Sequence, residues 1–354
     1  MKKKIVMWWG RFDESYSRNR ILRHQFLKLG YKIIDFKPIV SCLGFYEAFI
    51  ILKIKPDFIW VPCFRHRDVK SASKWANKLN VPVIFDPLIS VWDKKIREKK
   101  KYSEKNFLSK FIKSKEKCRF SHANLVVADT ELHAEFFSKH LGINKSKLSV
   151  INVGAEENIF SPSKKKQTQK LELLFYGSFL DLHGVDVLIK AARMISDHYC
   201  NWVFIGDGPT LADTKKMARG LTNVKFKSSV PYKNLPKFIN KADVVLGIFS
   251  DSEKARNVIP NKVYQSLASG KPIITRFSEA YPKNISDKKD GIFFVNPNSP
   301  REISEIIEKI FKTKGLLISA SQAAEKTYKR NFSEKIIRAQ LYATIKKINL
   351  LFHK

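Results

Sequence analysis

The feature that most constrains this chain is a regular alternation of short apolar segments with segments of helical periodicity. In the first half, the apolar segments lie at residues 4–9, 31–36, 56–62, 81–87, 123–129 and 147–153. Between them, apolar residues recur at helical spacing, as in residues 17–30, which end on a glycine. Strands that are apolar on both faces and alternate with helices are typical of a parallel sheet covered on both sides.

The same alternation begins again in the second half, at residues 171–177, 201–209, 223–228, 242–249, 272–276 and 291–297. The segment 154–170 is polar, rich in lysine and carries a proline, so we predict that it links two domains. The fold class is therefore α/β, with two Rossmann-like doubly wound domains in tandem over residues 1–153 and 171–332. A last helical segment lies within residues 333–354.

The charge of the chain restricts its partners. Lysine and arginine number 66 against 33 acidic residues, a formal net charge of +33. Such a field attracts nucleic acid, anionic lipid headgroups or phosphorylated substrates, although a lysine-rich genome also raises the count. The sequence carries no helix-turn-helix, no K/R-G-F motif and no aromatic platform, so nucleic acid is not an expected partner.

Cysteine usage and hydropathy indicate the compartment. The four cysteines lie far apart, which predicts neither a disulfide framework nor a zinc cluster and favours a reducing environment. The first apolar run is too short for a signal peptide, and no run approaches the roughly 18–20 residues of a membrane helix. We therefore expect a cytoplasmic protein.

Ligands of doubly wound sheets bind beyond the carboxyl ends of the strands, where glycines let the backbone approach them. Two such turns in the second half carry candidate binding residues: Gly177, Ser178 and His183 in the first, and Gly206, Asp207 and Gly208 in the second. The first turn places a histidine near a phosphate or simply exposes it to solvent. The second is expected to be a tight turn with free N–H groups.

A third turn is the stretch RNVIPNKVYQSLASGKPII, residues 256–274. Asn261 is a good candidate for the N-cap of a helix, and Arg256 and Lys262 bracket the start of that helix. An anion placed there would meet main-chain N–H groups, the positive end of the helix dipole and two cations. The alternative is that both cations point into water.

These motifs resemble the GT-B fold of the family-4, retaining glycosyltransferases. The matching segments, in the order and at the intervals of that family, are YGSFLDLHGVDVLIKAA, FIGDGP, NVKFKSSVPYKNLPKFINKADVVLGIF and VIPNKVYQSLASGKPII. The resemblance implies two domains that face a cleft, and a second domain that binds a nucleotide-sugar. It places Gly177 and His183 near the diphosphate and residues 206–209 along the same cleft.

The sequence departs from the family at two glutamates that are usually eight positions apart. Asn257 and Gln265 occupy these positions. An amide side chain can form hydrogen bonds with hydroxyl groups, but it carries no charge. A sugar-nucleotide epimerase or a non-catalytic relative of the same fold therefore stays open as an alternative.

The family also often has an arginine and a lysine after the first strand of the second domain, where this chain has Ser178 and His183. We therefore expect Arg256 and Lys262 to supply the charge that stabilises the diphosphate. No Asp-x-Asp motif is present, so neither a metal nor another cofactor is expected.

The resemblance assigns the acceptor to the first domain. Asp86, which follows an apolar strand, is a candidate catalytic residue or an ordinary turn residue, and Arg18 and Arg20 could reach an acceptor phosphate. By analogy, the helix within 333–354 packs back on this domain.

Residues 94–119 carry twelve basic and three acidic side chains. Four apolar residues are interleaved at helical spacing: Phe107, Leu108, Phe111 and Ile112. Such a segment suits an anionic membrane surface, or else its apolar stripe faces the core and its back is solvated. Together these features predict a glycosyltransferase of cell-surface polysaccharide synthesis, acting on a glycan or lipid-linked acceptor at the inner face of the cytoplasmic membrane.

Overall fold

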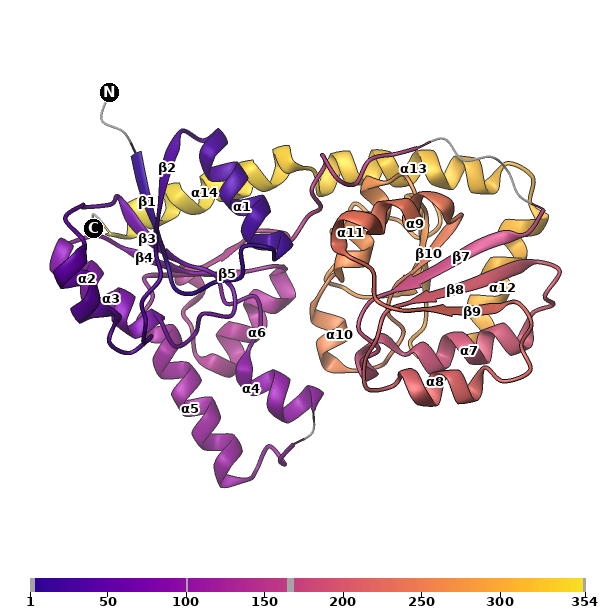
Figure 1. The fold of residues 1–354 in the computed structure, drawn as a ribbon, viewed down its shortest axis with the longest axis horizontal. Coiled ribbons are helices and arrows are strands. Elements are labelled where there is room, and N and C mark those ends of the chain that lie inside the picture. Colours follow the sequence, from indigo (N-terminus) through magenta and orange to yellow (C-terminus); the bar gives the residue numbers. More distant parts are fainter. Residues whose placement is uncertain (1–3, 100, 164–168, 353–354) are drawn as a thin grey trace. The chain divides into compact units, whose positions relative to one another are not determined.

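The computed structural model describes residues 4–99, 101–163 and 169–352. The chain divides into two compact units (Figure 1). The first consists of residues 1–153 together with 334–354, and the second of residues 154–333.

The first unit is built on a parallel six-stranded sheet with the strand order β2-β1-β3-β4-β5-β6. Its strands are β1 (Lys4–Trp9), β2 (Tyr31–Phe36), β3 (Phe58–Val61), β4 (Val83–Phe85), β5 (Leu125–Ala128) and β6 (Leu148–Val150). Every residue of β3, β4 and β5 is buried, as expected of central strands covered on both faces.

Helices cover both faces of this sheet. They are α1 (Ser17–Lys28), α2 (Gly44–Ile51), α3 (Val69–Leu79), α4 (Val91–Asp93), the π-helical turn η1 (Lys94–Glu98), α5 (Phe107–Ser121), α6 (Glu131–Leu141), the 3-10 turn η2 (Lys145–Lys147) and α14 (Glu334–Phe352). Trp8 in β1 packs on the side of α1 and α14, whereas Trp9 packs on the side of α3, α5 and α6.

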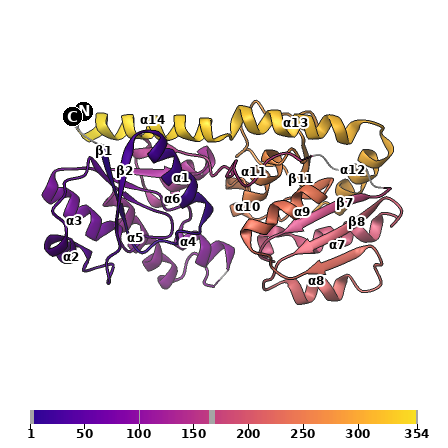
Figure 2. The ribbon, with the colours of Figure 1, turned by 45° about the horizontal axis from the view of Figure 1, so that its top comes forward.

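The helix α14 completes one face of the first unit. Its buried residues Ile337, Leu341, Ile345 and Ile348 recur at helical spacing and join the same cluster as Phe26 of α1. Figure 2 shows α14 lying along α1. The last helix of the sequence is thus part of the first hydrophobic core.

The second unit has a parallel six-stranded sheet with the order β12-β11-β10-β7-β8-β9. Its strands are β7 (Leu171–Tyr176), β8 (Cys200–Ile205), β9 (Val224–Lys227), β10 (Val244–Leu246), β11 (Ile273–Arg276) and β12 (Ile292–Val295). Its helices are η3 (Asp181–His183), α7 (Val185–Met194), α8 (Leu211–Met217), η4 (Tyr232–Asn234), α9 (Leu235–Lys241), α10 (Glu253–Asn257), α11 (Asn261–Ala268), α12 (Pro300–Lys312) and α13 (Leu316–Asn331).

Both faces of this sheet are covered as well. α7 and α12 pack on each other and bury isoleucines and leucines against one face. α9 and α11 contact strands on the other face, and α13 packs on α11 (Figure 1).

The segment 154–170, predicted to link the two domains, begins where the two units meet in the sequence, and its described residues pack on the second unit. Ala155 and Phe160 are buried in the second unit. The Tyr328 hydroxyl donates a hydrogen bond to the Ala155 carbonyl at 3.1 Å, and Phe160 meets Tyr232 edge to face. The described part of this segment therefore belongs to the second unit. Residues 164–168 lie outside the described residues.

Within the described ranges, no helix combines the length and the hydropathy that crossing a bilayer requires.

Candidate functional site

The candidate site lies at the carboxyl edge of the second sheet, where β8, β7 and β10 are neighbours. From β7 the chain proceeds through β8 to β9 on one side, and β10 then pairs with β7 on the other side. The strand order therefore reverses between β7 and β10. In an open α/β sheet, such a reversal opens a crevice in which ligands bind.

The two glycine turns of this edge pack directly against each other. A Cβ atom added to Gly206 would lie 2.0 Å from the Gly177 carbonyl oxygen, and one added to Gly208 would lie 2.6 Å from the Phe179 nitrogen. Gly206 and Gly208 also have φ angles of 139° and 150°, which favour glycine. Only glycine lets these two turns approach so closely.

The expectation of free N–H groups in the second turn is wrong for Gly206 and Gly208, and the N–H of Gly177 in the first turn is bonded as well. The Gly177 N–H donates to the Ile205 carbonyl at 2.9 Å, and the Gly206 N–H donates to the Lys227 carbonyl at 3.1 Å. The Gly208 N–H donates to the carboxylate of Asp207 at 2.7 Å. These three amides extend the ladder or close the turn, so they are not available to bind an anion.

Lys262 supplies a charge for an anion. It lies in the first turn of α11, but its side chain is buried and turns inward. Its Nζ lies 4.1 Å from the centre of the Phe175 ring and 3.4 Å from the Gly247 carbonyl oxygen, to which it donates a hydrogen bond. A Cβ on Gly177 would lie 3.3 Å from the Lys262 Cε, so the glycine makes room for the lysine.

His183 also lies beside Gly177. A Cβ on Gly177 would be 3.5 Å from its Cε1 atom, and its Nδ1 is buried with no hydrogen-bond partner among the described residues. Burial, and then the charge of Lys262, lowers the pKa of His183 to about 2, so its ring is neutral at physiological pH.

Burial also lowers the pKa of the Lys262 amine, to about 7. No carboxylate pairs with this amine in the part of the chain that the structure describes. An uncompensated cation in an apolar setting is poised to accept an anion, because an anion offsets the desolvation of the charge.

Gln265 lies one turn further along α11. It is buried, and its Oε1 accepts a hydrogen bond of 2.9 Å from the Tyr176 hydroxyl. Tyr176 is the last residue of β7, so the pair joins α11 to the strand that leads into Gly177. Asn257 is the last residue of α10 and is half-buried.

Arg256 and Lys262 do not bracket one anion site as predicted. Arg256 is exposed, and its guanidinium donates to Asp251 at 2.9 Å, whereas Lys262 points into the sheet edge. Asn261 is not an N-cap either. Pro260 holds the cap position with no side-chain cap, and Asn261 is the first helical residue, exposed to solvent. Ser178 and Asp207 are exposed beside the glycine turns.

In the first unit, Asp86 is completely buried. Both of its carboxylate oxygens accept hydrogen bonds from the Arg18 Nε, at 3.0 and 2.8 Å. Burial raises the pKa of Asp86, while the Arg18 guanidinium opposes this effect. Arg18 also donates to the Ile151 carbonyl at 3.0 Å, so neither member of this ion pair presents a charged group to an acceptor.

Sequence reasoning missed Phe175 and Tyr176, which hold Lys262 and Gln265 in place. Their position in the sequence could have identified them, because they are the last two residues of a strand that ends at a candidate glycine turn.

In the described residues, no three His, Cys, Asp or Glu side chains are grouped so that they could hold a metal ion.

Residues 156–330 match the model of the family "Glycosyl transferases group 1". The matched residues make up nearly the whole second unit. WbjE of Pseudomonas aeruginosa, whose name is that of a glycosyltransferase, is 23% identical over 49% of this chain and 43% of that protein. TuaH of Bacillus subtilis, whose name assigns it to teichuronic acid biosynthesis, is 24% identical over 59% of this chain and 54% of that protein. The chain thus spans about half the length of these curated relatives.

The crystal structure of HepE from Anabaena in complex with UDP is similar over 97% of this chain and 99% of that one, with a TM-score of 0.71 and 13% identity. This likeness establishes the fold of both units. The chain has the GT-B fold, and its second unit belongs to the group 1 glycosyl transferases.

Proposed function

We propose that this chain is a glycosyltransferase that moves a sugar from a nucleotide-sugar donor to a glycan or lipid-linked acceptor in the synthesis of a cell-surface polysaccharide. The donor class is supported by HepE, whose structures contain UDP in one case and UDP-glucose in another. The product class is supported by the name of TuaH. The observation that carries the proposal is the buried, carboxylate-free amine of Lys262 beside Gly177.

The leaving group explains why such an amine is useful. As the bond between the sugar C1 and the diphosphate oxygen breaks, its electron pair stays on the oxygen, and the Lys262 ammonium neutralises the growing negative charge. The acceptor hydroxyl forms the new bond to C1, and its proton passes to the departing diphosphate. We propose attack on the same face of the sugar, which retains the configuration at C1.

The side chains near Lys262 fit this assignment. His183 is neutral, so it accepts or donates a hydrogen bond without competing for the anion. Gln265 offers its amide to a hydroxyl group of the donor while Tyr176 fixes its orientation. Because a lysine neutralises the leaving group, we propose a reaction that is independent of metal ions.

We also place the reaction in the cytoplasm. The four cysteines, Cys42, Cys63, Cys118 and Cys200, are free thiols, two of them exposed. Exposed free thiols are typical of a reducing compartment.

The test is donor hydrolysis and transfer across UDP-, GDP- and ADP-sugars, with and without a chelator. We expect turnover with one donor class, unchanged by the chelator, and a product whose anomeric configuration by NMR equals that of the donor. Lys262→Met should lower kcat by about 100-fold or more, in the range of a lost oxyanion donor. The matched control is Lys190→Met, which removes an exposed lysine paired with Asp186 and should leave kcat unchanged.

No turnover and no thermal shift with any nucleotide would overturn the proposal. A second candidate is a sugar-nucleotide epimerase or a non-catalytic nucleotide-binding relative. The observation that favours it is the hydrogen bond from the Tyr176 hydroxyl to the side-chain oxygen of Gln265, because this oxygen is then not free to bind a hydroxyl group of a donor. A thermal shift with UDP but no transfer, or NMR signals of an epimerised donor, would assign the chain to this candidate.

A further inference from the structure

The first unit carries a helix, α2, that packs on α3 with one side and leaves most of its apolar side chains exposed. Of the eight residues of α2, only Gly44 and Ala48 are buried. Phe49, Ile50 and Ile51 are 59%, 79% and 65% exposed. The flanking chain adds further exposed apolar side chains, namely Ile39, Val40, Leu43, Tyr46 and Ile54. Exposed apolar side chains gathered on one short helix and its flanks are typical of an interaction site.

A second exposed apolar group lies at the start of α5. Phe107, Leu108 and Phe111 are exposed, and the rings of Phe107 and Phe111 stack with their centres 6.4 Å apart. Ile112, by contrast, packs against the core. The apolar stripe expected within residues 94–119 is therefore divided between solvent and core; Lys100 of that segment lies outside the described residues.

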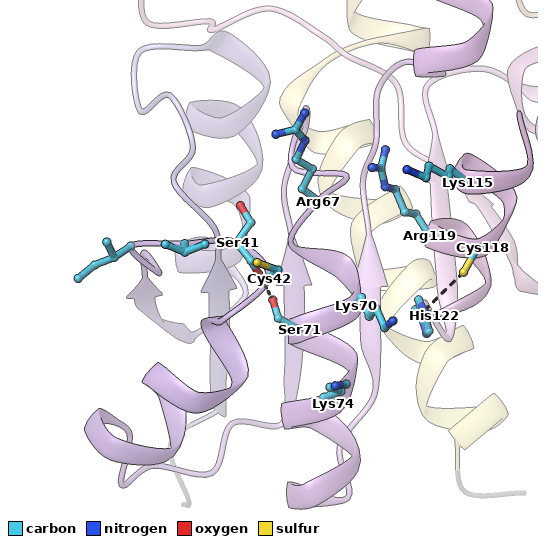
Figure 3. A pocket seen from close by; sticks show the side chains of 12 residues that line it. Ser41, Cys42, Arg67, Lys70, Ser71, Lys74, Lys115, Cys118, Arg119 and His122 are labelled. Carbon is cyan, nitrogen blue, oxygen red and sulfur yellow. Dashed lines mark hydrogen bonds between the residues drawn. The ribbon is translucent and has the colours of Figure 1, made fainter. Parts of the chain in front are cut away.

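A basic groove adjoins the first of these apolar groups. It runs between α3 and α5, has a volume of about 700 Å³ and is lined by Arg67, Lys70, Lys74, Lys115, Arg119 and His122 (Figure 3). No carboxylate lines it, and Ile39 and Val40 form part of its wall. The cationic lining and the exposed apolar surface are thus continuous.

A second hollow of about 660 Å³ adjoins the first and shares Arg67, Lys115 and Arg119 with it. The two carboxylates that line this second hollow already have partners within the protein. Asp68 is paired with Arg65 at 2.6 Å, and Glu116 accepts hydrogen bonds from the Ser90 hydroxyl and from the main-chain N–H groups of residues 91 and 92.

The cations of the basic groove have little compensation within the protein: burial raises the pKa of Glu116 and the charge of Arg119 opposes this effect, but the two form no ion pair. Among the described residues, Arg67, Lys70, Lys74, Lys115 and Arg119 make no ion pair. Burial lowers the pKa of His122, and the charges of Lys70 and Lys74 lower it further, so the groove carries a net positive field. Phosphate oxygens complement such a lining.

We propose that the face formed by α2, α3 and α5, here called the docking face, binds an anionic lipid bilayer. The apolar side chains of α2 and of the first turn of α5 enter the boundary between headgroups and acyl chains, and the basic groove takes lipid phosphates. A nucleic acid would complement the cations but not the aliphatic side chains of α2. The inference rests on the proposed function in so far as this bilayer carries the lipid-linked acceptor.

The test is co-sedimentation of the full chain with phosphatidylcholine vesicles that contain 30% phosphatidylglycerol, compared with vesicles of phosphatidylcholine alone. We expect binding to the anionic vesicles that weakens as salt is raised. Lys70→Gln with Lys74→Gln should weaken this binding at least tenfold, and Ile50→Ser should weaken it at low and high salt alike. The control pair is Lys215→Gln with Lys216→Gln on α8, which removes the same charge from the second unit.

The assignment would be overturned if the chain bound neutral vesicles as well as anionic ones. It would also be overturned if the control pair of substitutions weakened vesicle binding as much as Lys70→Gln with Lys74→Gln. Binding of single-stranded RNA in place of vesicles would also overturn it, as would loss of self-association in the Ile50→Ser variant without any loss of vesicle binding. Circular dichroism should show that each variant is folded. UDP binding, measured without vesicles, separates this inference from the proposed function, because every docking-face variant should bind UDP as the parent does.

Discussion

The amine of Lys262 lies over the ring of Phe175, with 4.1 Å between Nζ and the ring centre. The ring belongs to the strand β7, whereas the lysine belongs to α11, the second helix after β10. The contact therefore joins the two sides of the point where the strand order reverses. It keeps the amine in place before any ligand arrives, at a buried position that lowers its pKa.

Binding of UDP should depend on pH through Lys262. The amine has a pKa of about 7 in the free protein, and bound phosphates raise it. The contribution of the lysine is thus fully present below pH 7 and is lost as the pH rises toward the pKa of the complex. We expect the affinity for UDP, measured calorimetrically from pH 7 to 9, to fall by up to about tenfold per unit. The second pKa of a phosphate is about 6, so UDP itself adds little over this range.

Lys262→Met should bind UDP weakly and without this slope. Lys190→Met should keep the slope of the parent, because its lysine is exposed on α7. An unchanged slope in Lys262→Met would falsify the assignment of the titration.

Replacement of Gly206 by alanine should disrupt the glycine turns. The new Cβ would lie 2.0 Å from the Gly177 carbonyl oxygen, so the main chain has to shift. Gly220 is the matched control, because it also has a positive φ, of 85°, but nothing within 4 Å of an added Cβ. We expect urea unfolding to show a loss of about 1–2 kcal/mol for Gly220→Ala, from backbone strain alone, and a clearly larger loss for Gly206→Ala. Equal losses would show that the close approach of the turns has no energetic weight.

Tyr176 and Gln265 should be coupled energetically. Each of Tyr176→Phe and Gln265→Leu leaves one buried polar group without its partner, which costs about 1–3 kcal/mol. The double variant removes both groups, so its loss should be smaller than the sum of the single losses by about 1 kcal/mol. Additive losses in a double-mutant cycle would contradict the hydrogen bond.

Asp86 should prove to be a structural residue. Asp86→Asn leaves the Arg18 guanidinium buried without its counter-ion, and such a change costs about 3–5 kcal/mol of unfolding free energy. The control is Asp35→Asn, because the Arg23–Asp35 pair is partly exposed and should contribute less than about 1 kcal/mol. If Asp86→Asn lost transfer activity but kept full stability, Asp86 would be a catalytic residue after all.

Much of the fold could be predicted from the sequence. The alternation of apolar strands and amphipathic helices encodes two parallel sheets, because each strand buried on both faces needs a helix on either side. The resemblance to GT-B glycosyltransferases is confirmed, since residues 156–330 match the family model and both units have the GT-B fold. Local patterns of this kind survive in the sequence even where the identity to relatives is low.

The direction of individual charged side chains could not be predicted in the same way. Lys262 turns inward because Gly177, 85 positions earlier, leaves space for it. Asp86 is closed off by Arg18, which lies 68 positions away. The exposure of α2 could not be predicted either, because the sequence GFYEAFII is as apolar as that of a core helix. These features depend on tertiary contacts, which spacing along the chain does not specify.

The buried position of α14 also has a consequence for biosynthesis. Residues 334–352 supply four isoleucine and leucine side chains to the core that contains β1 and α1, yet the ribosome makes them after the entire second unit. The contiguous second unit can fold as it emerges, whereas the first must wait with an open apolar face until translation has passed residue 348. A nascent chain arrested before α14 should therefore be retained by chaperones through its amino-terminal half.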